Sequence, residues 1–137
     1  MNRNPKTLVL PEFSNREDIY ILFGVFDDDT GNPIDMTALG WTFQFEIRRL
    51  PPHWNMGWTG PWYDTDLPAP IIILALGTGK DAVNVLDVGK GLIWVSETNA
   101  RKLHHRTYQA ALVGNDGSRQ FQIFNATLPM QYGGVTN

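Results

Sequence analysis

The stretch YQAALVGNDGSRQFQIFNATL, residues 108–128, contains two runs of strand-type residues separated by a polar segment. An Asp-Gly pair between two such runs is the strongest short-range signal for a β-hairpin, because glycine accepts the positive φ of a tight turn. The sequence therefore predicts a hairpin whose turn contains Asp116 and Gly117. In the second run the apolar positions change parity between Ile123 and Phe124, which predicts either a β-bulge or burial on both faces.

Residues 42–50 show the clearest two-residue period of the chain. The apolar positions are Phe43, Phe45 and Ile47, and the polar positions are Gln44, Glu46 and Arg48. Successive side chains of a strand point to opposite faces, so this pattern predicts a strand with one buried and one exposed face.

Two other segments are apolar at both parities. Residues 19–26, IYILFGVF, are rich in β-branched and aromatic types, which predicts a central strand covered on both faces. Residues 71–76 predict a second, shorter strand of the buried type. The intervening DDDTGNP, residues 27–33, predicts a turn, because its Asp, Asn, Gly and Pro all favour turn conformations.

The rest of the chain offers shorter elements. Residues 82–88 and 92–95 have the composition of strands, and TLVL, residues 7–10, predicts either a short first strand or an arm. Residues 96–104 predict a brief helix with Ser96 or Thr98 as cap candidates, and Ala100 and Leu103 would face the core.

Together these elements predict an all-β fold, an immunoglobulin-like antiparallel β-sandwich of about seven strands with one short helix. We expect residues 1–16 to form an N-terminal arm or first strand, residues 17–130 the sandwich, and residues 131–137 a C-terminal tail. Residues 51–66 are expected to form a Trp-rich insertion loop within the sandwich domain.

Composition restricts the classes of function. The chain has 137 residues, no cysteine and a formal net charge of −3. Disulfide scaffolds and thiolate chemistry are therefore excluded, and one core is expected. No basic run is longer than Arg48-Arg49, and the longest aliphatic run is residues 71–76, so we expect neither a nucleic-acid nor a membrane partner. Without a recognisable signal peptide, the protein is expected to be made in the cytoplasm.

Local motifs predict no catalytic residue, cofactor or metal. The acidic loop that begins at Asp27 invites a calcium interpretation, but an EF-hand would need Gly where Asn32 stands and Glu where Ala38 stands. A solvated turn is favoured there. His104 and His105 are adjacent, so their side chains diverge on regular backbone. GTGKDA, residues 77–82, lacks the spacing of a phosphate-binding loop, and no serine lies in a GxSxG motif.

The segment HWNMGWTGPWYDTD, residues 53–66, holds three of the five tryptophans. Two interpretations remain open for it: an insertion that packs on the sandwich and contacts another protein, or a platform that stacks on sugar rings. A carboxylate pair for glycoside hydrolysis at Asp64 and Asp66 is less favoured. The predicted interaction surface consists of Trp54, Trp58, Trp62 and Tyr63.

Two longer stretches carry a family resemblance. Residues 19–49 contain a hydrophobic strand, an acidic turn, the step Pro33-Ile34-Asp35-Met36-Thr37 and a strand that ends in Arg. Residues 92–130 contain a helical turn, a Tyr-bearing strand and the Asp-Gly hairpin. Over residues 17–130 the chain resembles small β-sandwich proteins from the structural regions of tailed phages and prophages, which are similar to the N-terminal module of the phage baseplate upper protein.

The resemblance implies a non-catalytic virion protein of the tail, baseplate or head-tail region that acts by assembly. It implies partners among copies of the chain and other virion proteins, and a location in the virion. It also implies that Tyr108 is buried with its hydroxyl bonded near the short helix, and that Thr37 closes the turn after the acidic loop. The alternative function is a carbohydrate-binding module that uses the Trp-rich loop.

Overall fold

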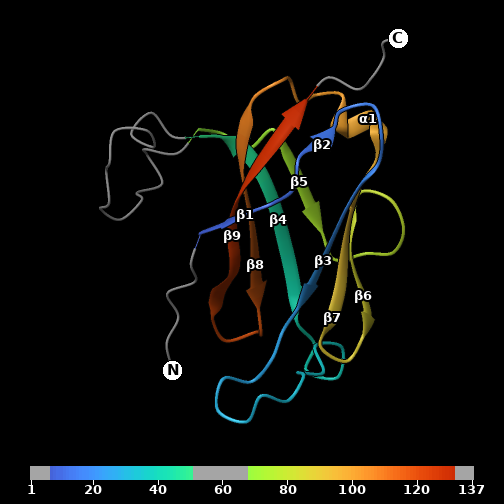
Figure 1. Cartoon of the computed structure of the whole chain (residues 1–137). Coiled ribbons are helices and arrows are strands. Elements are labelled where there is room, and N and C mark those ends of the chain that lie inside the picture. The colour runs from blue at the N-terminus through green and yellow to red at the C-terminus, as the bar shows by residue number, and fades with distance from the viewer. Residues whose placement is uncertain (1–6, 51–67, 132–137) are drawn as a thin grey trace.

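Two β-sheets face each other in the computed structural model, which describes residues 7–50 and 68–131 (Figure 1). The larger sheet has the order β1-β9-β8-β4-β5, with β2 also paired to β9, and the smaller sheet has the order β3-β7-β6. The elements are β1 (Thr7–Val9), β2 (Phe13–Ser14), β3 (Ile19–Gly24), β4 (Thr42–Arg49), β5 (Ile72–Ala75), β6 (Ala82–Asp87), β7 (Lys90–Val95), α1 (Glu97–Ala100), β8 (Thr107–Asn115) and β9 (Gln120–Gln131).

The all-β sandwich is confirmed, and its strand order is that of an immunoglobulin-like fold. The described residues form nine strands in place of the expected seven or so, because the N-terminal segment adds the short strands β1 and β2. Both of these pair in parallel with β9, so the larger sheet is mixed. All other strand pairs are antiparallel.

The predicted hairpin is present between β8 and β9. Gly117 in the turn has φ +96°, and the Asp116 carboxylate accepts bonds from the N–H groups of Ser118 and Arg119 at 2.8 and 3.0 Å. Pairing jumps from Leu112↔Phe124 to Val113↔Gln122, which leaves Ile123 unpaired. A β-bulge, and not burial on both faces, thus explains the parity change.

The core lies between the sheets and confirms the alternation predicted for β4. Phe43, Phe45 and Ile47 are buried, whereas Gln44, Glu46 and Arg48 lie on the outer face. The other large buried side chains come from both sheets, from the turn before β4 and from the helix region: Ile19, Ile21, Met36, Ile72, Leu74, Val83, Ile93, Val95, Leu103, Tyr108, Leu112, Phe124, Leu128 and Met130.

Two strand predictions were wrong in the same way. β3 is an edge strand of the smaller sheet, and its outer residues Tyr20 and Leu22 are 51% and 74% exposed. β5 is likewise an edge strand, with Ile73 exposed. Apolar side chains at both parities normally report two covered faces. In these strands one apolar face packs in the core and the other remains open among the described residues.

A buried tyrosine fixes the connection between α1 and β8. Tyr108 is 1% exposed, and its hydroxyl accepts a bond of 2.7 Å from the His104 N–H. A tyrosine at the start of this strand, bonded to backbone just upstream, is typical of immunoglobulin-like folds. Ser96 caps α1 as predicted, since its hydroxyl accepts from the Asn99 N–H. Ala100 and Leu103 are fully buried, also as predicted.

We predict that Tyr108→Phe destabilises the fold by about 1–2 kcal/mol, because the partly buried His104 N–H loses its acceptor while the ring still fills its site. Urea unfolding followed by circular dichroism measures this difference. The control is Tyr20→Phe. The Tyr20 hydroxyl is exposed and makes a longer bond, so this substitution should change stability by less than about 0.5 kcal/mol. Equal stabilities of the two variants would contradict the prediction.

Candidate interaction surfaces

The four residues of the predicted interaction surface, Trp54, Trp58, Trp62 and Tyr63, lie outside the described residues, as do Asp64 and Asp66. The segment that contains them leaves the larger sheet after β4 and returns before β5. At this junction Arg48 donates a bond of 2.9 Å from Nη1 to the Pro68 carbonyl.

The acidic loop is organised by its own backbone. The Asp27 carboxylate accepts bonds from the N–H groups of Asp29 and Thr30, and Gly31 has φ +76°. Within residues 7–50 and 68–131, no three or more His, Asp and Glu side chains are grouped as a metal site would require. Thr37 lies in the following turn, where its carbonyl accepts from the Gly40 N–H.

The glycine-rich turn before β6 is closed by a side chain of the same sheet. Asn84 accepts from the Gly79 N–H at 2.6 Å and donates to the Gly79 carbonyl at 3.0 Å. These two bonds pair the backbone N–H and the carbonyl of Gly79 within the turn. The chain then continues into the strand β6, whereas a phosphate-binding loop leads into a helix.

In the part of the chain that the structure describes, we find no helix with the length and apolarity needed to span a bilayer.

The outer side of the smaller sheet carries an apolar face, which we define by Tyr20, Leu22, Leu92 and Trp94. Tyr20 lies opposite Trp94 and Leu22 opposite Leu92 in the ladder between β3 and β7. The rings of Tyr20 and Trp94 are 5.4 Å apart between centroids, and Leu92 and Trp94 are partly exposed. Aromatic side chains with defined positions on an accessible face are frequent anchors of protein interfaces.

Asp18 orients the two aromatic rings of the apolar face. Its Oδ2 accepts bonds from Trp94 Nε1 at 2.9 Å and from the Tyr20 hydroxyl at 3.4 Å, while its Oδ1 accepts from the Glu97 N–H at 2.8 Å. The bonds from Trp94 and then Glu97 lower the pKa of Asp18 below its usual 3.8. The carboxylate therefore connects β3, β7 and α1 at one end of the sandwich.

The apolar face adjoins an open sheet edge. β3 pairs with β7 only, and no described strand lies along its other edge. Val25 donates from its N–H to the Gly89 carbonyl, and ladder bonds alternate along an antiparallel pair. The backbone groups of Tyr20 and Leu22 consequently point toward the open edge.

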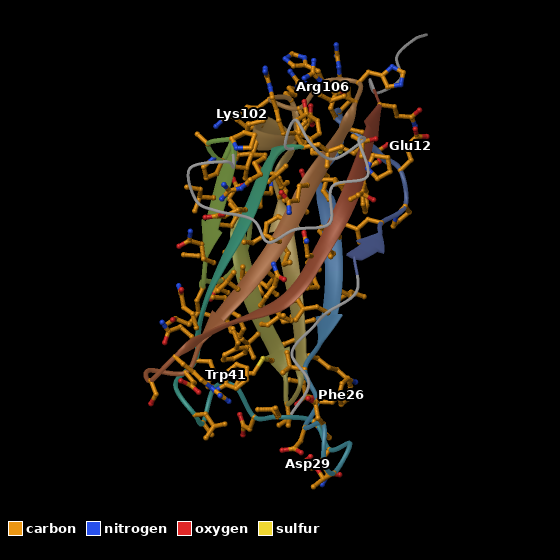
Figure 2. All side chains as sticks on the ribbon, turned by 90° about the vertical axis from the view of Figure 1, so that its left-hand side faces the viewer. Glu12, Phe26, Asp29, Trp41, Lys102 and Arg106 are labelled. Carbon is orange, nitrogen blue, oxygen red and sulfur yellow. The ribbon has the colours of Figure 1, made fainter. Side chains whose placement is uncertain are left out.

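The outer side of the larger sheet is polar and hollowed. Figure 2 views this sheet from outside, with β9, β8, β4 and β5 side by side. A hollow of about 540 Å³, which we call the amide trough, is lined by Gln44, Glu46, Arg48, Pro70, Gln109, Ala111, Val113, Gln120, Gln122 and Asn125. The exposed alternation of β4 was predicted from sequence, but no signal in one strand identifies the strands beside it.

No family model matches the sequence, and no curated protein shows significant similarity to it.

We predict that Asp18→Asn destabilises the protein at neutral pH and that its difference from the wild type closes as the pH falls. Because the folded-state pKa lies below 3.8, the carboxylate's contribution is complete above that pH and is lost as the pH falls through the folded value. Urea unfolding across a pH series measures the difference.

The matched control for this experiment is Asp29→Asn. Asp29 is exposed in the acidic loop, at the end of the sandwich opposite Lys102 and Arg106 (Figure 2). Its substitution should leave stability nearly unchanged at every pH. A difference between Asp18→Asn and the wild type that did not vary with pH would contradict the assignment of Asp18.

Proposed function

We propose that the protein is a non-catalytic structural component of a tailed-phage or prophage virion, and that it works by associating with copies of itself and with other virion proteins. The observation that supports this association is the open edge of β3 beside the apolar face. The resemblance of residues 17–130 to phage β-sandwich proteins supports the virion setting.

The composition of β3 favours a covered edge. Exposed edge strands usually carry charges, proline or a bulge that prevent pairing with other chains. The six residues of β3, IYILFG, contain no charge and no proline, and their ladder with β7 is continuous. Such an edge is expected to pair with another strand in the working protein.

A second copy of this chain is the occupant that we propose for the edge. Two β3 strands related by a two-fold axis pair antiparallel, which joins two three-stranded sheets into one. The same operation brings the two apolar faces side by side on one surface of the joined sheet. Tyr20 and Trp94 are already held by Asp18, so little side-chain freedom is lost when they are covered.

The distribution of charge is compatible with this contact. Both signs of charge occur at one end of the sandwich, where Lys102, Arg106 and Glu12 lie, and Asp29 lies at the opposite end (Figure 2). The apolar face between these ends carries no charged side chain of its own. Its pairing is therefore not opposed by repulsion between like charges.

We predict that Leu22→Lys weakens self-association by at least about tenfold, because it brings two like charges close together beside the two-fold axis. Leu22 is 74% exposed, so the folded monomer should tolerate the change. Size-exclusion chromatography with light scattering over a concentration series measures the mass. The wild type should approach twice the chain mass, 15.5 kDa, as concentration rises.

The control is Leu39→Lys, a comparable change at a 59% exposed leucine in the turn after the acidic loop. It should associate like the wild type. A wild type that remained monomeric at every concentration, or a Leu22→Lys variant that dimerised equally well, would refute the β3 contact. Mass spectrometry of virions purified from the host that carries the gene tests the virion setting separately.

A further inference from the structure

We infer that the amide trough of the larger sheet is a binding site for a neutral polyhydroxylated ligand, of which an oligosaccharide is the chemical class. This inference does not depend on the proposed assembly. The trough and the apolar face lie on the outer sides of different sheets, so one can be occupied while the other is covered.

The shape of the trough follows from the register of three strands. Small side chains on β8 form the floor, and longer polar side chains on β4 and β9 form the walls. Ala111 lies between Glu46 and Asn125, and Val113 lies between Gln44 and Gln122. The resulting volume of about 540 Å³ is within the range of small-ligand sites, roughly 300–1,000 Å³.

One buried polar atom in the lining has no hydrogen-bond partner. Gln109 is 6% exposed, and its Nε2 donates a bond of 2.9 Å to Asn125 Oδ1, whereas its Oε1 is buried without any hydrogen bond. A buried unmatched acceptor costs free energy, and native structures retain few of them. The terminal torsion of glutamine is soft, so the amide can turn toward the trough when a ligand supplies the missing bond.

A hydroxyl group matches this atom in either orientation of the amides. If the oxygen and nitrogen of both Gln109 and Asn125 are exchanged, the bond between them persists and the unmatched atom becomes an N–H donor. A hydroxyl donates and accepts, so it completes the pair in both cases. Backbone groups of a peptide offer only one of these functions at a given position.

The charges of the trough indicate a neutral ligand. Glu46 and Arg48 are its only charged residues, and they form an ion pair with each other. Gln44 donates to the second oxygen of Glu46, and Arg48 also donates to the Pro68 carbonyl. The remaining polar lining consists of amides, which bind hydroxyls without preference for a charged group.

The test is heteronuclear NMR of the full chain during titration with neutral cello-, malto-, xylo- and chito-oligosaccharides. Side-chain amide signals of Gln109 and Asn125 report directly on the trough. At least one of these sugars should shift them together with backbone signals of Ala111 and Val113. Absence of binding by the whole panel, or shifts confined to another surface, would overturn the inference, as would binding of a sulfated oligosaccharide alone.

Two variants then test the geometry. Ala111→Phe fills the floor from the outer face and should weaken binding at least about tenfold, and Gln109→Met should weaken it by a similar factor, the equivalent of one hydrogen bond. Gln109→Met should change stability little, because removal of the unmatched atom offsets the loss of the bond to Asn125.

The matched controls are Ala38→Phe and Gln131→Met, which change exposed positions outside the trough lining and should bind like the wild type. Equal affinities of the trough variants and these controls would refute the site. Leu22→Lys should bind the sugar normally even where it abolishes self-association, so failure of one proposal is distinguishable from failure of the other.

Discussion

The register of β8 between β4 and β9 is the constraint on which both the core and the outer surface depend. Its inner side chains, Tyr108, Ala110 and Leu112, are buried, and its outer ones, Gln109, Ala111 and Val113, line the trough. A slip by one residue would exchange the two sets. The bulge at Ile123 is essential to this arrangement. Gln122 and Phe124 have the same parity, yet the bulge lets Phe124 face Leu112 in the core while Gln122 lies opposite Val113 outside.

The sequence allowed the local parts of this arrangement to be predicted, because each has a short-range cause. Asp116 and Gly117 determine a turn by their own conformational preferences, and Ser96 caps a helix by a bond to a nearby backbone N–H. The alternation of apolar and polar residues in β4 predicts which of its side chains are buried, and this prediction needs no knowledge of the neighbouring strands. The parity change near Ile123 was visible, and the structure identifies it as a bulge.

The order of strands in the sheets was beyond such reasoning, and so were the two surfaces. Hydropathy reports that a side chain avoids water, but it does not say whether its own chain or a partner covers it. For this reason Tyr20 and Leu22 predicted a central strand, although β3 lies at an edge. The amide trough requires β4 beside the hairpin of β8 and β9, and these two parts are far apart in sequence. Gln44, Ala111 and Asn125 have no motif in common, and only their pairing in space makes them neighbours.

An immunoglobulin-like sandwich separates the two surfaces by placing its core between them. The six-stranded sheet exposes amides around a shallow floor, whereas the three-stranded sheet exposes apolar side chains next to an unpaired edge. Hydrophobic association is suited to the second surface and hydroxyl recognition to the first, because amides remain hydrated until a ligand replaces the water. Asp18 fixes the aromatic pair on one side, and Gln109 retains an unmatched atom on the other. Because the core lies between them, the self-association that we propose through β3 would leave the trough open, and a dimer would present one trough for each copy of the chain.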